Sequence, residues 1–312
     1  MRSRLISRRW GVAVLAAGLF LLGAYATVSL VVVQQALVAE AHAFEYLPED
    51  LGLAYETVEF RPRSDEDITL RGWWLAAADA RATVIWVHGL DGTRASRLPL
   101  LQDLVARGFN VLTFDLRGHG ASDKALMGAG LHEQSDLQGA IDYALDERDV
   151  ASGTLFLMGS SFGAAVTLLV GPDEPAVAGV YADSAFANLG DMITAEVAKR
   201  TVLPLFGAKL LKPGLVMAGR IFRGIDLSAV RPVDAAARYR YPIGIAHCET
   251  DERIPYSHGV AIGESAPSGS PFETYACEHA NGYDAFPEQY TGAVVAYLDS
   301  RLAGAPASAV ER

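Results

Sequence analysis

The stretch Thr154-Leu-Phe-Leu-Met-Gly-Ser-Ser-Phe-Gly163 decides the fold of this chain. Its first five residues are typical of a strand buried on both faces of a sheet, and the apolar run 164–170 predicts a short helix. Glycines on both sides of Ser161 allow a sharp turn between the two elements. The pattern G-x-S-x-G therefore predicts a turn that holds the Ser161 hydroxyl above the sheet, where the helix N-terminus favours developing negative charge.

Strand and helix patterns alternate on both sides of this turn. Strands are predicted at 57–60, 68–75, 82–88, 110–114, 154–158, 177–181, 243–247 and 272–276, and helices at 94–107, 133–148, 164–170 and 287–301. This alternation predicts an α/β fold with a mostly parallel central sheet of about eight strands, flanked by helices. The strand rhythm stops over 185–239, where an apolar, proline-broken stretch predicts a short helical cap inserted over the sheet.

The N-terminal segment differs in composition from the rest of the chain. Residues 11–33 carry no charged side chain and as a helix would span roughly 35 Å, enough for a bilayer core of about 30 Å. Basic residues precede the segment and acidic residues follow it; they are Arg2, Arg4, Arg8 and Arg9, then Glu40, Glu45, Glu49 and Asp50. We therefore expect a transmembrane signal anchor with residues 1–10 cytoplasmic and the rest of the chain extracytoplasmic.

Two alternatives to the anchor stay open. A cleaved signal peptide would also carry arginines, and Ala41-His42-Ala43 resembles a cleavage site, although signal peptides have a shorter apolar core of about 7–15 residues. A buried core helix is the other alternative. On the anchor interpretation, 34–53 is a juxtamembrane linker, 54–302 the main domain and 303–312 a flexible tail.

Composition excludes several classes of protein. The net charge of −11 and the pI near 5.1 argue against a nucleic-acid partner, which needs a clustered basic face. Two cysteines cannot form a zinc ribbon, and no run of His, Asp and Glu has metal-ligand spacing. The sequence thus predicts no metal and no cofactor.

A serine hydroxyl needs a base, and His279 is the best candidate. It follows the last predicted strand and precedes the turn Asn281-Gly282. Asp251 follows the preceding strand and is the expected acid, so the order along the chain is Ser, Asp, His. Glu249 and Asp183 are rival acids.

Two backbone amides are expected to bind the oxyanion of a tetrahedral intermediate. One is the amide of Phe162, directly after the candidate nucleophile. The other lies in the loop after the strand that ends at His88, and we assign it to Leu90.

Further motifs identify a resemblance. Asp115-Leu-Arg-Gly-His-Gly-Ala-Ser122 looks like the D-x-R-G-H-G-x-S signature of alpha/beta hydrolases, and H-G, G-x-S-x-G and D-x-x-x-P occur in the family's order. The resemblance covers roughly residues 56–302 and is closest to single-anchor membrane hydrolases with a short cap. It implies structural roles for His88, Gly89, Asp115, Arg117, Gly118, His119, Gly120, Gly159 and Gly163. A serine nucleophile departs from the haloalkane dehalogenases, which use aspartate, and from the cysteine-bearing dienelactone hydrolases.

The implied chemistry is two-step acyl transfer through an acyl-enzyme. We expect an esterase or thioesterase acting on small-molecule acyl substrates. A serine peptidase with the same three residues and a catalytically inactive binding module are the alternatives.

Three weaker signals remain. Residues 197–224 contain six basic and no acidic residues, which fits either a solvated cap face or a cap resting on anionic lipid. Cys248 and Cys277 end successive strands and are either free thiols or a disulfide. Trp73, Trp74 and Trp86 are interpreted as sheet packing rather than ligand stacking.

Overall fold

The computed structural model describes residues 2–39, 44, 46–90, 92–200 and 205–304. Two units are distinguished: one consists of Met1–Leu37 with Gly190–Ala229, and the other of Val38–Leu189 with Val230–Arg312. The second unit holds the sheet and is called the hydrolase unit below; the first is called the α1–cap unit.

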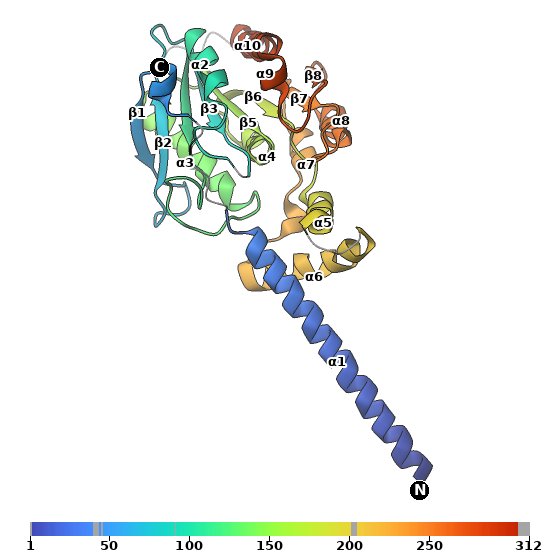
Figure 1. Ribbon diagram of the computed structural model, residues 1–312. Coiled ribbons are helices and arrows are strands. Elements are labelled where there is room, and N and C mark those ends of the chain that lie inside the picture. The colour runs from blue at the N-terminus through green and yellow to red at the C-terminus, as the bar shows by residue number, and fades with distance from the viewer. Residues whose placement is uncertain (1, 40–43, 45, 91, 201–204, 305–312) are drawn as a thin grey trace. The chain divides into compact units, whose positions relative to one another are not determined.

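The hydrolase unit is built on a mixed sheet, and the described residues form it from eight strands (Figure 1). The strands are β1 (Glu56–Phe60), β2 (Leu70–Leu75), β3 (Ala82–Val87), β4 (Phe109–Phe114), β5 (Leu155–Ser160), β6 (Val177–Asp183), β7 (Gly244–Cys248) and β8 (Phe272–Tyr275). Their order is β1-β2-β4-β3-β5-β6-β7-β8, and all from β4 to β8 run parallel while β1 and β2 are antiparallel. The predicted α/β class and strand number are confirmed.

The order of the strands fixes where a site can form. After β3 the chain moves outward to β4 and then returns to the other side of β3 to form β5. Loops that leave the carboxyl ends of strands on either side of such a reversal separate and leave a crevice. The loop after β3, which starts at His88, and the turn after β5, which holds Ser161, meet at this point.

Helices cover both faces of the sheet. They are α2 (Leu98–Ala106), α3 (His132–Asp146), α4 (Phe162–Val170), α7 (Pro232–Ala236), α8 (Tyr256–Ser265), α9 (Gly282–Ala285) and α10 (Pro287–Ala303), with short 3-10 turns η1 (Pro48–Leu51) and η2 (Gly171–Asp173). Helices α2 and α10 contact each other over one face, and α3 and α4 contact each other over the opposite face (Figure 1). Because both faces are covered, β3, β5 and β6 are buried at every position.

The core beneath α2 and α10 is rich in aromatic residues. Trp73 and Trp86 are buried there and Trp74 is buried too, which confirms the interpretation that the tryptophans pack in the sheet. The guanidinium carbon of Arg94 lies 4.6 Å from the ring centroid of Trp73, a cation–π contact.

Two helices differ from the predictions. The predicted helix 94–107 begins only at Leu98, because Arg97 adopts a left-handed conformation with φ of 63°. Helix α8 was not predicted, since Tyr-Ser-His-Gly-Val-Ala-Ile-Gly-Glu-Ser has two glycines and no strong apolar period. Packing against β7 and α7 stabilises it instead.

A disulfide joins Cys248 to Cys277, with 5.0 Å between the two Cα atoms. The bond links the ends of β7 and β8, and both side chains are buried. Thr250 strengthens the same junction, because its hydroxyl donates a hydrogen bond of 2.7 Å to the Cys277 carbonyl. The loops that carry Asp251 and His279 therefore leave the sheet from a cross-linked pair of strands.

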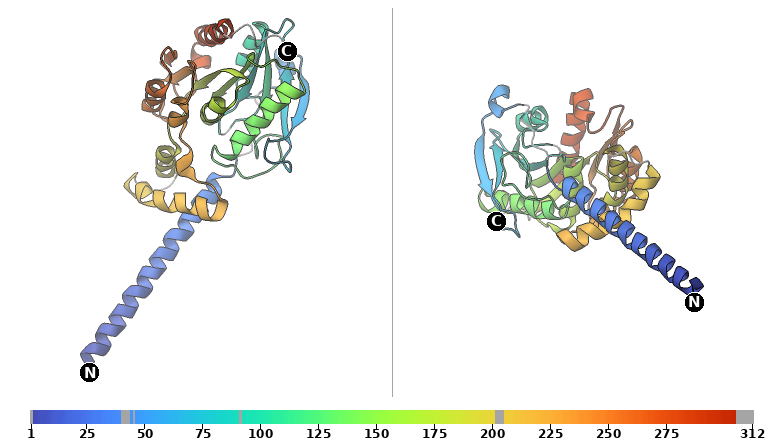
Figure 2. Two further views of the ribbon diagram at one scale, coloured as in Figure 1. Left: turned by 180° about the vertical axis from the view of Figure 1, so that it is seen from behind. Right: turned by 60° about the horizontal axis from the view of Figure 1, so that its bottom comes forward.

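The α1–cap unit contains α1 (Arg2–Ala36), α5 (Leu189–Arg200), α6 (Leu205–Arg223) and η3 (Leu227–Ala229). Within α1, Trp10–Gln35 is long and apolar enough to cross a membrane, as an anchor or a signal sequence is, with a mean hydropathy of 2.1. Helix α6 crosses α1 in both views of Figure 2. The Tyr25 hydroxyl donates 2.8 Å to the Leu210 carbonyl and accepts 2.9 Å from the Gly214 amide. The proposed cleavage site at 41–43 and the tail from residue 305 lie outside the described residues.

Candidate active site

Ser161 occupies the turn between β5 and α4 in a strained conformation. Its φ is 55° and its ψ is −118°, a region that costs a residue with a side chain about 1–3 kcal/mol. The surrounding backbone holds it there, because its amide donates 2.8 Å to the Asp183 carbonyl on β6 and its carbonyl accepts 3.1 Å from the Ala165 amide. The turn lifts the serine hydroxyl off the carboxyl end of the sheet.

The two glycines of the motif are required by close backbone contacts. A Cβ on Gly163 would lie 2.2 Å from the Val87 carbonyl oxygen, and one on Gly159 would lie 2.7 Å from the Gly163 carbonyl carbon. Both distances are shorter than real Cβ contacts allow. Glycine at these positions lets α4 begin directly against the end of β3.

Ser161, His279 and Asp251 form a hydrogen-bonded chain. His279 Nε2 lies 2.8 Å from Ser161 Oγ, and His279 Nδ1 lies 2.7 Å from Asp251 Oδ2. The structure thus brings together the three side chains that the sequence predicts as nucleophile, base and acid. The side chain of Asp251 is fully buried and that of His279 is partly exposed.

The surroundings of Asp251 fix the tautomer of His279. Burial alone would raise the Asp251 pKa, but the hydrogen bond and charge of His279 and the Ile254 amide outweigh burial and lower it. Asp251 Oδ1 accepts 2.9 Å from the Arg253 amide and 2.7 Å from the Ile254 amide. An ionised carboxylate only accepts hydrogen bonds, so His279 Nδ1 carries the proton and Nε2 accepts from the Ser161 hydroxyl.

The two rival acids lie elsewhere. Asp183 accepts a hydrogen bond of 3.0 Å from the Tyr290 hydroxyl and one of 2.9 Å from the Ser184 hydroxyl, and burial raises its pKa. Glu249 is exposed. Among the described contacts, neither carboxylate bonds to His279.

The Gly89–Leu90 peptide is fixed by its carbonyl oxygen. Gly89 O accepts 2.7 Å from His88 Nδ1 and 2.9 Å from the Gly92 amide. In a trans peptide the N–H points opposite to the C=O, so these two bonds also fix the direction of the Leu90 N–H. A Cβ on Gly89 would lie 3.4 Å from Ser161 Cβ, which places this peptide against the serine.

Phe162 is the first residue of α4, so its amide has no carbonyl partner within the helix. The helix N-terminus adds a partial positive charge at the same position. The amides of Phe162 and Leu90 therefore belong to two segments that meet at Ser161.

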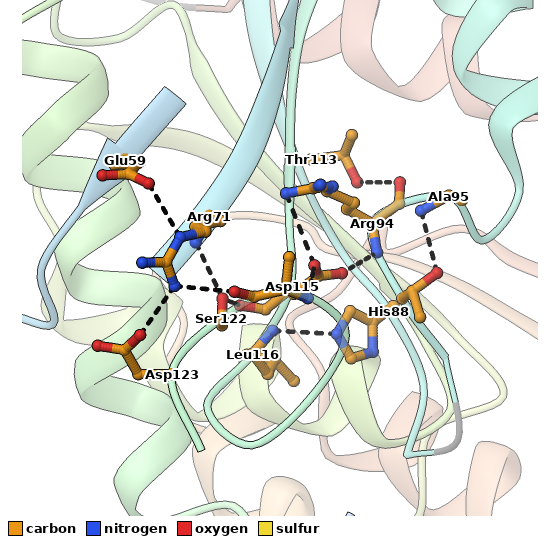
Figure 3. Close-up of polar contacts among 12 residues, drawn as sticks. Glu59, Arg71, His88, Arg94, Ala95, Thr113, Asp115, Leu116, Ser122 and Asp123 are labelled. Atoms are coloured by element: carbon orange, nitrogen blue, oxygen red, sulfur yellow. Dashed lines mark hydrogen bonds and ion pairs between the residues drawn. The ribbon is translucent and has the colours of Figure 1, made fainter. Parts of the chain in front are cut away.

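His88 is held as a neutral ring. Its Nε2 accepts 3.0 Å from the Leu116 amide (Figure 3). Its proton therefore resides on Nδ1 and is donated to the Gly89 carbonyl. Burial and the neighbouring His119 ring, opposed by the hydrogen bond to Gly89, lower the His88 pKa to about 3.

Asp115 ties the loop after β3 to the loop after β4 (Figure 3). Its Oδ1 accepts 2.6 Å from the Arg94 amide, its Oδ2 accepts 2.8 Å from the Ala121 amide, and its carbonyl accepts 2.6 Å from the Ser122 hydroxyl. Gly120 is required beside it, because a Cβ there would lie 2.2 Å from Asp115 Oδ2.

The remaining motif residues brace the same loop. His119 Nε2 lies 2.6 Å from the Leu90 carbonyl, and Arg117 forms a buried ion pair with Asp136 at 2.7 Å. Gly118 has a φ of 76°, and a Cβ on it would lie 2.6 Å from the Ala125 carbonyl oxygen. His119 thus contacts the loop near Ser161 through a backbone carbonyl, and its implied structural role stays a prediction.

Two residues at the site were not predicted. The Arg97 guanidinium binds the Ala280 carbonyl, Asn281 Oδ1 at 3.1 Å and the Asp284 carboxylate, so it holds the segment directly after His279. His247 Nε2 donates 2.9 Å to the Ile254 carbonyl and lies 3.6 Å from Asp251 Oδ2, bracing the loop of the acid. Neither residue belongs to a local motif, so only the tertiary fold identifies them.

Among the described residues, no group of three or more His, Cys, Asp or Glu side chains has the arrangement of a metal site.

Comparison with known proteins gives a matching family model and a related protein. The family model described as serine aminopeptidase, S33, matches residues 78–254, which include Ser161 and Asp251 and are more than half of the chain. The uncharacterized protein YfhR of Escherichia coli O157:H7 is 27% identical over 279 residues, which is 82% of this chain and 88% of YfhR.

Two solved structures have the same fold. The Pyrococcus furiosus esterase Pf2001 superposes with a TM-score of 0.69 at 21% identity, covering 85% of this chain and 99% of the esterase. The acylaminoacyl peptidase of Pyrococcus horikoshii superposes with a TM-score of 0.61 at 12% identity, covering 83% of this chain and 43% of the peptidase.

The pKa of His88 predicts a pH dependence of stability. Between pH about 3 and 6.5 the unfolded chain binds a proton on this ring and the folded chain does not, so stability falls as the pH is lowered through this window. The full loss for one such group is up to about 5 kcal/mol. Urea unfolding of the detergent-solubilised chain across this pH range should show a steeper decline for the wild type than for His88→Asn. Equal slopes would contradict the neutral assignment of His88.

Proposed function

Because the chain belongs to the serine aminopeptidase S33 family of alpha/beta hydrolases, we propose that it is a serine hydrolase that cleaves carboxylic ester or thioester bonds of acyl substrates. The observation that carries the proposal is the hydrogen-bonded chain from Ser161 through His279 to Asp251. Ser161 is the nucleophile, His279 the general base and Asp251 the group that orients and stabilises the histidine.

The reaction begins when Ser161 Oγ attacks the carbonyl carbon of the substrate and His279 Nε2 takes the hydroxyl proton. The ionised Asp251 stabilises the imidazolium that forms. Collapse of the tetrahedral intermediate releases the alcohol or thiol, which receives its proton from His279, and leaves an acyl-enzyme. Water, deprotonated by His279, then attacks the acyl carbon, and Ser161 regains its proton as the acid leaves.

The amides of Phe162 and Leu90 are proposed to hold the negative oxygen of each tetrahedral intermediate. One such donor stabilises a transition state by about 3–4 kcal/mol when it is fixed in advance. The bonds from His88 and Gly92 to the Gly89 carbonyl and the bond from His119 to the Leu90 carbonyl support this role.

A serine peptidase is the second candidate, favoured by the description of the family. An aminopeptidase must also bind the ammonium group of its substrate, and a carboxylate usually does this. The Asp251 carboxylate is engaged by the His279 ring, and the Asp183 carboxylate is engaged by the Tyr290 and Ser184 hydroxyls. These two acids are therefore already bound to other side chains and do not stand ready for an ammonium group.

Labelling with a fluorophosphonate tests the proposed nucleophile. The probe should form an adduct on Ser161 in the wild type, and Ser161→Ala should lose both labelling and p-nitrophenyl ester hydrolysis, on the order of 10⁶-fold in kcat. Ser160→Ala is the matched control, because Ser160 is the adjacent serine and is expected to leave labelling intact. Mass spectrometry locates the adduct.

An adduct on Ser160, or no adduct on a folded chain, would contradict the assignment and favour the inactive binding module. Turnover of aminoacyl p-nitroanilides at rates above those for p-nitrophenyl esters would favour the peptidase instead.

We further propose that α1 is a retained signal anchor, with residues 1–10 cytoplasmic and the hydrolase unit on the opposite side. Only 11% of the span window is buried, which is uncharacteristic of a core helix, and a disulfide suits an oxidising compartment. If α1 were removed as a signal peptide, the Leu210 carbonyl and the Gly214 amide of α6 would lose their hydrogen bonds with the Tyr25 hydroxyl.

The mass of the mature chain and its accessibility from outside the cell test this topology. The membrane fraction should contain the full 33.3 kDa chain, and protease added outside intact cells should degrade the hydrolase unit. A mature chain that begins after Ala43 would show that the segment is a cleaved signal peptide. Protection of the hydrolase unit from external protease would indicate the opposite orientation in the membrane.

A further inference from the structure

Helix α6 exposes an apolar stripe. Phe206, Leu210, Met217 and Ile221 have 72%, 59%, 62% and 65% of their surface exposed. They follow one another at spacings of four, seven and four residues, so they lie on one face of the helix. Large side chains on one continuous face of a cap helix are unusual for a surface in contact with water.

The other faces of α6 are occupied. Ala208, Leu211, Leu215 and Ala218 are buried, and the basic residues lie along one flank of the stripe. Lys212 is paired with Asp191 at 3.7 Å and Arg220 with Asp226. Acidic residues outside 197–224 therefore neutralise part of the basic charge of this segment. The apolar stripe is the stronger feature of this surface.

Helix α6 lies against α1, which has exposed apolar side chains of its own. Tyr25 contacts α6 through Leu210 and Gly214, and a Cβ on Gly214 would lie 2.3 Å from Ser29 Oγ, so the two helices touch closely. Phe20 and Leu21 on α1 are also largely exposed.

The point at which α6 crosses α1 determines how deep α6 would lie in a membrane spanned by α1. Tyr25 lies ten residues before the end of the span at Gln35, or about 15 Å along the helix. A helix that lies in the membrane interface buries its apolar face about 5–10 Å into the headgroup and acyl boundary. As a helix, the Trp10–Gln35 span is about 39 Å long and exceeds a bilayer core of about 30 Å by roughly 9 Å. With this excess on the side of the hydrolase unit, the crossing lies about 6 Å below the edge of the core, within that range.

We propose that α6 is an in-plane membrane helix whose stripe inserts into the bilayer interface on the side of the hydrolase unit. The occupant of the stripe is phospholipid, and insertion is driven by apolar burial rather than by attraction to anionic headgroups. This inference rests on the proposed role of α1 as a membrane span.

Fluorescence quenching in proteoliposomes tests the insertion on the full-length chain. Because both native cysteines are in the disulfide, a single introduced cysteine is the site that a maleimide dye labels. The dye is attached in turn to Met217→Cys in the stripe, to Leu22→Cys in the span and to Gly292→Cys. Gly292 is the matched control, since it is exposed on α10 and a Cβ there meets nothing within 4 Å.

Phosphatidylcholine vesicles carry a nitroxide either near the headgroup or near the end of the acyl chain. The headgroup-level nitroxide should quench the Met217 dye at least about threefold more than the Gly292 dye, while the deep nitroxide should quench the Leu22 dye. The quenching of the Met217 dye should be unchanged when phosphatidylglycerol is added in equimolar amount.

The other outcomes overturn the inference in separable ways. If the Leu22 dye is quenched and the Met217 dye is not, the anchor is supported and the insertion of α6 is contradicted. If the Met217 dye is blue-shifted but unquenched, a second copy of the chain covers the stripe. Quenching of the Met217 dye only with phosphatidylglycerol indicates charge-driven binding. An unquenched Leu22 dye contradicts the proposed span itself.

Discussion

The close approach of Gly163 to the carbonyl end of β3 is the constraint on which the rest of the site depends. A Cβ at this position would overlap the Val87 carbonyl oxygen, so only glycine lets α4 begin directly against the neighbouring strand. The helix then holds Ser161 in its strained conformation with a positive φ and lifts the hydroxyl off the sheet. The same approach brings the Gly89–Leu90 peptide against Ser161, so one backbone contact positions both the proposed nucleophile and a proposed oxyanion donor.

Buried polar groups then hold this arrangement in one protonation state. His88 has a pKa near 3 and uses both ring nitrogens on backbone partners, and Asp115 accepts amide hydrogen bonds from two loops. Asp251 is stabilised as an anion by amides and by His279. For the proposed reaction, the site is thus prepared before a substrate arrives, because no charged group has to reorganise when an oxyanion forms.

Local patterns were sufficient to predict much of this structure. The continuous apolar runs of β3 and β5, the glycines around Ser161 and the turn residues around His279 each encode a local element, and their order along the chain encodes the fold. The α/β class, the strand number and the proximity of Ser161, Asp251 and His279 follow from such patterns. The alpha/beta-hydrolase class was predicted from the resemblance carried by the motifs, among them the one that begins at Asp115. Helix boundaries were less well predicted, because Arg97 is held out of α2 by tertiary contacts and α8 has weak intrinsic helix propensity.

Contacts that join distant segments of the chain could not be predicted from local patterns. Arg97 reaches the residues after His279 across more than 180 positions, and Tyr25 reaches α6 across a similar separation. The sequence left the state of Cys248 and Cys277 open, because neighbouring strands alone do not determine whether their Cα atoms come to 5.0 Å. The exposed stripe on α6 was not predicted either, because the sequence shows where the basic residues are but not which apolar side chains face outward.

The most direct test of the account is a crystal structure of the chain with a phosphonate bound covalently to Ser161. The phosphonyl oxygen should lie within hydrogen-bond distance, about 2.7–3.1 Å, of both the Phe162 and the Leu90 amide nitrogens, with His279 Nε2 beside Ser161 Oγ. A phosphonyl oxygen turned away from these amides would contradict the claim that the backbone around Gly89 and Gly163 forms a prepared oxyanion site.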